Sequence, residues 1–359
     1  MPAPIREYPL DRCDRFLAKC KAHRKAIKIF ATGDSWLAAP GGWWRGASVV
    51  NLLNDDNWVH AIDPAHPGFN ILSIAKVGFV VDKMPTDHDL LALDYVRGEF
   101  DRQNVPFAFD AFMVSAGGND FIPKADTYIT GGNGNAAINT AALDALFDRI
   151  KLRWGQLLSR LAPGNAPVLT NGYGPIIPTL KEGTTWLPGL EVGPWVGPWL
   201  LGHCGLDDAA AQALAAEVVD RFNDVVSAIP GATYFDLRPT VAAMPASMWH
   251  DEIHFTGAGW ERIAQQWMSA IDAAIADAAP TPVAFARLKL PAAPILRPSP
   301  AMRKTAKPSP RVAARKATAK TPRKNVRASE KPRAAARTKP AATAAKRRRA
   351  PRGTSGRYR

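Results

Sequence analysis

Between residues 27 and 280, short apolar runs alternate with longer stretches in which apolar residues recur at every third or fourth position. Short apolar runs of this kind are typical of strands that are buried in a parallel sheet. They occur at Ile27–Ala31, Ile71–Ala75, Ala111–Ser115 and Pro167–Thr170, with a weaker run at Thr233–Leu237. We therefore expect a parallel sheet built from these segments.

Three apolar stripes have helical spacing. They extend over residues 143–161, 214–229 and 260–275, and Asp207 precedes the second as a candidate N-cap. Strands that alternate with helices favour a sheet covered by helices on both faces. The fold class predicted from the pattern is thus α/β, with three layers and a parallel sheet.

The segment 171–204 breaks this alternation, because it is rich in Gly, Pro and Trp and has no period. It is too long for a simple connection, and long irregular loops in compact domains often act as lids or binding loops. A loop folded over the sheet edge is the alternative interpretation. Trp43 and Trp44 either face the same pocket or belong to the core. The glycine-rich residues 130–135 lack the Lys-Ser/Thr of a phosphate-binding loop and predict a flexible turn.

Composition changes at about residue 280, after which the chain is mostly Ala, Pro, Lys and Arg. Residues 287–359 hold 24 of the 46 basic side chains and one of the 32 acidic ones, Glu330, so residues 1–286 carry a net charge of −9. Such a segment cannot bury enough apolar surface to offset the entropy lost on ordering, and we expect it to be disordered. The expected division is an N-terminal extension (1–26), a catalytic domain (27–280, with the insertion 171–204) and a disordered basic tail (281–359).

The basic tail resembles the Lys/Ala/Pro-rich tail of linker histones in composition. Its charge density predicts salt-sensitive, sequence-independent binding to polyanions by counterion release. DNA or RNA is the expected partner, and polyphosphate or an anionic membrane is an alternative. A solvating tail without a dedicated partner is the other interpretation.

Three features indicate the compartment. The cysteines, Cys13, Cys20 and Cys204, are odd in number and have no CxxC spacing, which suits a reducing compartment. The N-terminus lacks the apolar core of a secretory signal, and no run of about 18 apolar residues occurs. We expect a cytoplasmic protein without a transmembrane segment, with nucleoid association through the tail as a further possibility.

The histidines show no metal-ligand spacing, so neither a metal nor a cofactor is expected.

Three polar motifs follow predicted strands or precede the last predicted helix. Ser35 ends the sequence Gly33-Asp34-Ser35 directly after the first strand, where open α/β sheets bind ligands. Asp251 and His254 are spaced so that one turn can supply both an imidazole base and the carboxylate that orients it. Asn119, in the motif GGND, can direct its amide at a developing oxyanion. Each motif alone also suits a helix cap, a solvated histidine or a tight turn.

Taken together and in this order, the motifs resemble those of the SGNH (GDSL-type) hydrolase family, over about residues 27–280. The resemblance implies a three-layer α/β/α, flavodoxin-like fold and a serine esterase. By position, Ser35 would be the nucleophile, His254 the general base and acid, and Asp251 the residue that orients it. The backbone N–H groups of Ser35 and Gly78 and the side chain of Asn119 would form the oxyanion hole.

The sequence departs from the family pattern at several positions. Trp36 replaces the commoner Leu and should affect packing more than chemistry, although Trp36 and Trp186 are also candidates for substrate contact. Ser73 stands where an Asn often precedes the glycine, so Gly78 is the loosest match. His250 is adjacent to Asp251, but the motif spacing favours His254 as the base.

The resulting hypothesis is a serine esterase that hydrolyses acyl or O-acetyl esters through an acyl-enzyme. The alternative is a degenerate hydrolase fold that serves as a scaffold for polyanion binding. Every triad and oxyanion-hole position still carries a competent residue, which favours the enzyme.

Overall fold

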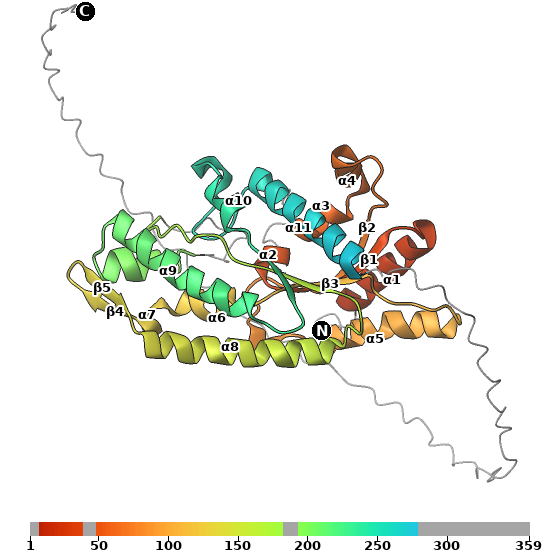
Figure 1. Ribbon diagram of the computed structural model, residues 1–359, viewed down its shortest axis with the longest axis horizontal. Coiled ribbons are helices and arrows are strands. Elements are labelled where there is room, and N and C mark those ends of the chain that lie inside the picture. Colours follow the sequence, from red (N-terminus) through yellow and green to blue (C-terminus); the bar gives the residue numbers. More distant parts are fainter. Residues whose placement is uncertain (1–6, 39–47, 182–192, 279–359) are drawn as a thin grey trace, which may run out of the picture. The chain divides into compact units, whose positions relative to one another are not determined.

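A computed structural model describes residues 7–38, 48–181 and 193–278 (Figure 1). Its strands are β1 (Ile27–Gly33), β2 (Phe69–Ser73), β3 (Ala111–Ser115), β4 (Ile129–Gly132), β5 (Asn135–Ile138), β6 (Val168–Asn171) and β7 (Thr233–Phe235). The long helices are α1 (Glu7–Ala22), α5 (Asp87–Arg102), α8 (Thr140–Leu161), α9 (Asp208–Ser227) and α11 (Gly257–Ala278).

Shorter helices connect these elements. The α-helical ones are α2 (Ser35–Ala38), α3 (Val49–Asn54), α4 (Asp56–Ile62), α6 (Gly118–Phe121), α7 (Ala125–Tyr128) and α10 (Arg238–Ala242). Single 3-10 turns occupy Val81–Lys83, Ile122–Lys124 and Ala246–Met248, and a π-helical turn occupies Pro198–His203.

Five strands form one parallel sheet in the order β2-β1-β3-β6-β7. This is the doubly wound order of flavodoxin-like folds, in which ligands bind outside the carboxyl ends of the strands near the point where the order reverses. Here that point lies between β1 and β3. Its consecutive residues Ile29 and Phe30 are both fully buried, as expected for a strand between two helix layers.

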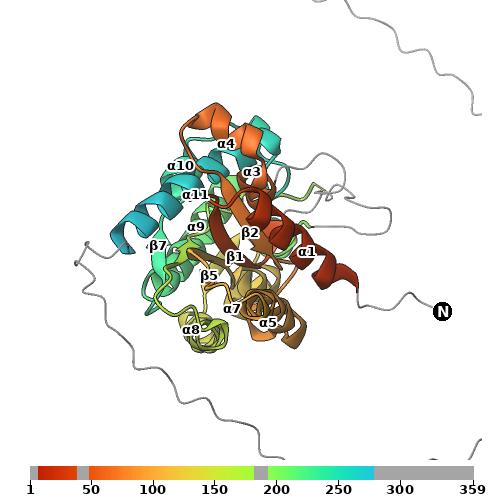
Figure 2. The ribbon, with the colours of Figure 1, turned by 90° about the vertical axis from the view of Figure 1, so that its right-hand side faces the viewer.

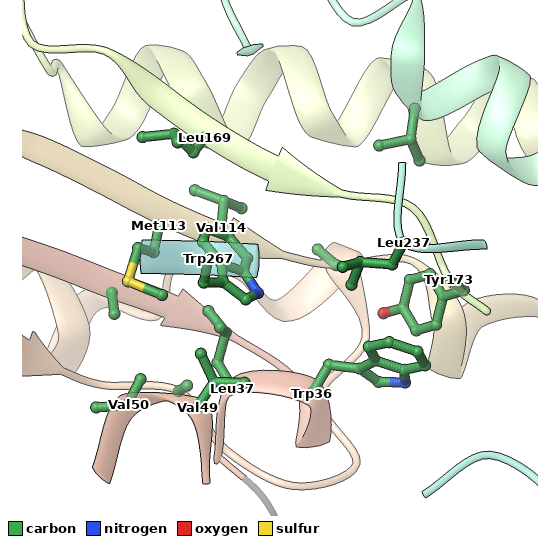
Figure 3. Close-up of a cluster of buried hydrophobic side chains, with 14 of the residues drawn as sticks. Trp36, Leu37, Val49, Val50, Met113, Val114, Leu169, Tyr173, Leu237 and Trp267 are labelled. Atoms are coloured by element: carbon green, nitrogen blue, oxygen red, sulfur yellow. The ribbon is translucent and has the colours of Figure 1, made fainter. Parts of the chain in front are cut away.

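Helices cover both faces of the sheet (Figure 2). α3 and α11 pack together on one face, whereas α5 and α8 lie on the other. The core between the sheet and α11 contains Trp267, Val114 and Leu169 (Figure 3). The three-layer α/β/α architecture predicted from the sequence is therefore confirmed.

The start of α9 agrees with the helix cap predicted from the sequence. The Asp207 side chain accepts a hydrogen bond from the Ala210 N–H at 2.8 Å, so Asp207 is the N-cap of α9 as predicted.

The glycine-rich residues 130–135, expected to be only a flexible turn, instead belong to the β4–β5 hairpin. Its turn residues Asn133 and Gly134 both have positive φ, which matches the right-handed twist of the flanking strands.

The N-terminal segment also contributes to the core. Within the range expected to be an extension, α1 packs against α5 and β2. Its buried residues Cys13, Phe16 and Cys20 form an apolar stripe, and the Phe16 ring lies against Phe109 with centroids 5.6 Å apart. The basic tail and its expected disorder lie outside the described residues.

Candidate active site

Ser35 begins α2, immediately beyond the carboxyl end of β1. The turn before it passes very close to β3, because the Asp34 N–H donates to the Ser115 carbonyl at 2.9 Å. A Cβ on Gly33 would lie only 2.5 Å from that carbonyl oxygen, so glycine permits this approach. The hydroxyl of Ser35 is thereby held at the ligand-binding edge of the sheet, with 3% of the residue exposed.

His254 and Asp251 lie in a tight turn just before α11. The Asp251 Oδ1 accepts the backbone N–H groups of Ile253 and His254, at 2.9 and 2.8 Å, and thereby shapes the turn. The His250 N–H donates to the His254 carbonyl at 2.9 Å and closes it. Of the two neighbouring histidines, the structure brings His254 to the serine.

A continuous hydrogen-bonded chain joins the three predicted triad residues. The Nε2 atom of His254 lies 2.9 Å from the Ser35 Oγ, and its Nδ1 lies 2.8 Å from the Asp251 Oδ2. All three side chains are buried or nearly so. Residues that are 219 positions apart in the sequence therefore meet as nucleophile, base and orienting acid would.

The charge on Asp251 determines the proton positions. Burial raises its pKa, but hydrogen bonds from His254 and from the turn backbone outweigh burial, so the pKa lies below its ordinary value. An ionised carboxylate can only accept, and the imidazole Nδ1 must therefore carry the hydrogen. The Nε2 of His254 is then left to accept the Ser35 hydroxyl proton, which is the tautomer that a general base requires.

The loops after β1, β2 and β3 are joined beside Ser35. The Lys76 N–H donates to the Gly33 carbonyl at 2.9 Å, and the Asn119 side-chain amide donates to the Phe79 carbonyl at 3.0 Å. Gly78 lies between these two contacts with a φ of +74°. Among the described residues its N–H has no hydrogen-bond acceptor. The candidate oxyanion residues thus occupy one connected set of loops.

A buried polar cluster supports the serine turn and was not predicted. Asp34 accepts hydrogen bonds from the Trp36 N–H and the Ser115 hydroxyl, each at 3.0 Å, and from the Tyr173 hydroxyl. Burial raises the pKa of Asp34 to about 6, although these hydrogen bonds oppose the rise. The hydrogen bond from the Trp36 N–H to Asp34 caps the start of α2. A helix cap was the alternative interpretation of the Gly33-Asp34-Ser35 motif. Tyr173 carried no sequence signal.

The predicted substrate-binding tryptophans have different outcomes. Trp36 is 3% exposed, and its ring packs edge-on against Tyr173 (Figure 3). It makes similar contacts with Phe255 and Trp260. The Trp36 ring is therefore packed among aromatic residues, and its contact with substrate stays a prediction. Trp186, like Trp43 and Trp44, lies outside the described residues.

The described part of the chain also bears on metal binding and on membrane insertion. It contains no group of three or more His, Cys, Asp or Glu residues that could hold a metal ion. None of its helices is long and apolar enough to cross a membrane.

No protein-family model matches the chain, and no curated protein does. Similar solved structures include a lipase from a goat rumen metagenome, with 12% identity and a TM-score of 0.43, covering 68% of this chain and 97% of the lipase. An acetylxylan esterase from Geobacillus stearothermophilus has 12% identity and a TM-score of 0.39, covering 68% and 94%. A phospholipase A1 from Streptomyces albidoflavus has 16% identity and a TM-score of 0.36, covering 68% and 99%.

Proposed function

We propose that the protein is a serine esterase that hydrolyses carboxylic esters through an acyl-enzyme. The observation that carries the proposal is the chain from Asp251 through His254 to Ser35, with heavy-atom separations of 2.8 and 2.9 Å. A serine hydroxyl is a weak nucleophile until an adjacent base takes its proton. This chain of groups supplies that base, and it lies at the sheet edge where substrates of such folds bind.

In the first half of the reaction, the Ser35 Oγ attacks the ester carbonyl while its proton passes to the Nε2 of His254. The resulting imidazolium is stabilised by the Asp251 carboxylate at Nδ1. The tetrahedral intermediate then collapses, the bond to the alkoxy oxygen breaks, and His254 returns the proton to the departing alcohol. The acyl group is left on Ser35.

In the second half, water attacks the acyl-enzyme and transfers a proton to His254. Collapse of the second tetrahedral intermediate releases the carboxylic acid and restores the Ser35 hydroxyl. Each step uses only groups of this chain, the ester and water. Short acyl esters and O-acetyl groups are the proposed substrates.

The developing negative charge would be bound by the N–H groups of Ser35 and Gly78 and by the Asn119 amide. This part of the proposal is supported by the hydrogen bonds that join the three loops, and by the absence of an acceptor for the Gly78 N–H among the described residues. An amide nitrogen carries two hydrogens. One hydrogen of Asn119 is used on Phe79, and the second is assigned to the oxyanion.

The test is turnover of p-nitrophenyl esters of graded chain length, together with labelling by a fluorophosphonate. Wild type should hydrolyse at least one ester and be labelled at Ser35 as located by peptide mass spectrometry. Ser35→Ala should lose both properties. Ser159→Ala, which changes an exposed serine of α8, is the matched control and should retain them. Undiminished turnover in Ser35→Ala would refute the mechanism.

We also propose that the basic tail binds polyanions, because residues 287–359 are strongly positively charged. These residues lie outside the described ones. Polyanion binding does not depend on esterase activity. A degenerate hydrolase fold that only binds polyanions would give neither turnover nor phosphonate labelling, so the same test separates this alternative from the enzyme.

A further inference from the structure

Glu252 lies between the triad residues Asp251 and His254, yet it belongs to neither the triad nor the oxyanion hole. The residue is 0% exposed. A carboxylate removed from water in this way is costly unless hydrogen bonds or charges compensate it. Its partners therefore indicate what the residue does.

Four backbone N–H groups compensate the Glu252 carboxylate. The Oε1 atom accepts from Thr179 at 3.0 Å and from Gly197 at 2.7 Å. The Oε2 atom accepts from Val196 at 3.0 Å and from Trp195. In addition, the Glu252 carbonyl accepts the Ile177 N–H at 3.0 Å.

All of these donors belong to the segment 171–204, which has no periodic pattern of its own. They come from two separate stretches, residues 177–179 and 195–197, that meet at Glu252. The two stretches are in close contact at Gly197, where an added Cβ would lie 1.9 Å from the Thr179 carbonyl oxygen. The Glu252 side chain, which belongs to the turn of residues 250–254, thus holds two distant parts of the insertion together. We call this turn the catalytic turn.

The same contacts fix an aromatic ring beside the proposed base. The Trp195 ring lies edge-to-face against the His254 imidazole, with centroids 5.6 Å apart and planes at 70°. The Trp195 backbone N–H is itself bonded to Glu252, and the next residue, Val196, is buried. The position of Trp195 relative to His254 therefore depends on Glu252.

We propose that Glu252 is a positioning residue that anchors the insertion to the catalytic turn, so that Trp195 forms a wall of the site beside His254 and determines which esters react. The specificity part rests on the esterase proposed above, whereas the anchoring part stands on geometry alone. Neither residue takes part in bond making. Both act on where the ester lies relative to the Ser35 Oγ.

The first measurement tests the anchor without any substrate. In the full-length protein, Glu252→Gln replaces one acceptor oxygen by an amide that faces backbone donors. Hydrogen exchange should then accelerate at least about tenfold in peptides covering 177–179 and 195–197, while peptides covering β3 should be unchanged. Glu261→Gln, an exposed site on α11, is the control and should leave both regions unchanged. Unchanged exchange in Glu252→Gln would overturn the anchor.

The second measurement tests specificity by the ratio of kcat/KM for p-nitrophenyl octanoate to that for the acetate. Trp195→Ala should change this ratio by about tenfold or more, mainly through KM, because an apolar wall contributes discrimination of that order. Glu252→Gln should change the ratio in the same direction, and the double variant should add little. Trp195→Phe, which retains a ring, should change the ratio less than Trp195→Ala does.

The outcomes separate the two proposals. An equal loss on both esters, or an unchanged ratio in Trp195→Ala, would overturn the specificity role. Faster exchange in Glu252→Gln together with an inactive wild type would retain the anchor and refute the esterase. If Glu252→Gln does not fold, Glu252→Asp keeps the charge on a shorter side chain, and the same exchange and ratio criteria apply to it.

Discussion

Asp251 holds His254 at two points: its Oδ2 lies 2.8 Å from the imidazole Nδ1, and its Oδ1 lies 2.8 Å from the His254 backbone nitrogen. One carboxylate therefore fixes both the ring and the turn that carries it. Removing the charge of Asp251 should therefore change the tautomer of the His254 ring more than the position of the ring.

Asp251→Asn tests this separation. The amide can still accept the turn N–H groups through its oxygen, but its nitrogen would face Nδ1 and favour the tautomer with hydrogen on Nε2. Such a ring cannot take the serine proton, so we expect kcat on a p-nitrophenyl ester to fall by about 10⁴, as in comparable triads. Thermal unfolding should change little. A variant that retains wild-type kcat would contradict the assigned role of Asp251.

Asn119→Ala tests the oxyanion assignment. A donor that bonds most strongly to the tetrahedral intermediate contributes to kcat rather than to ground-state binding, so we expect kcat to fall by about 10²–10³ with a smaller change in KM. Steady-state kinetics on one ester measure both constants. A change confined to KM would place Asn119 in substrate binding. Loss of the Phe79 contact alone would appear as a lower unfolding temperature without a selective fall in kcat.

The raised pKa of Asp34 predicts an unusual dependence of stability on pH. Burial raises this pKa from 3.8 to about 6 in the folded protein. The folded state therefore binds the proton more tightly than the unfolded chain, and the resulting stabilisation is complete below about pH 4 and lost as the pH rises through 6. Between pH 7 and pH 4, the free energy of unfolding of wild type relative to Asp34→Asn should rise by up to about 3 kcal/mol.

Denaturant titrations of both proteins across this pH range measure that difference. Asp120, whose pKa burial also raises to about 6, is present in both proteins, so its own contribution largely cancels in the comparison. A difference that is constant from pH 4 to 7 would show that Asp34 has the same proton affinity in the folded and unfolded states.

The basic tail supports a prediction that is independent of catalysis. The full-length chain should bind duplex DNA without sequence preference, and the affinity should fall by about 10³ or more between 50 and 200 mM salt if six or more phosphates are neutralised. Truncation after Ala279 should abolish binding, because the rest of the chain is acidic overall. Turnover of a small neutral ester should be similar in both. Replacing Lys346–Arg349 by Gln should give partial loss of binding.

Fluorescence anisotropy with labelled duplexes measures this binding at each salt concentration. DNA binding that survives the truncation, or that does not respond to salt, would exclude the tail as the polyanion-binding segment.

The sheet was predictable because most residues of β1, β2, β3 and β6 are buried and therefore form short, mainly apolar runs in the sequence. β3 has the predicted bounds, and the other four strands differ by at most two residues at either end. Two of the long helices, α1 and α5, were not predicted. In α5, charged residues interrupt the apolar stripe, although Thr86 and Asp89 form a capping box that the sequence already contained.

The site was predictable only where its chemistry is local in sequence. Asp251 and His254 lie within one turn, and Ser35 directly follows a strand. Tyr173 and Glu252 were missed because their importance depends on partners 139 and 55–73 residues away. A segment without a hydrophobic period gives no sequence signal of where it folds, so the approach of Trp195 to His254 required the structure.

The separation of 219 residues between Ser35 and His254 has a consequence for how activity arises during synthesis. β1, which leads to the serine, is an interior strand of the sheet and is synthesised long before the histidine turn, which precedes α11. Contacts this distant in sequence form late, because closing the intervening chain costs entropy before they contribute. A nascent or partly folded chain should therefore contain the serine without a base. Recovery of turnover after dilution from denaturant should lag behind recovery of helical signal and report the last step of folding.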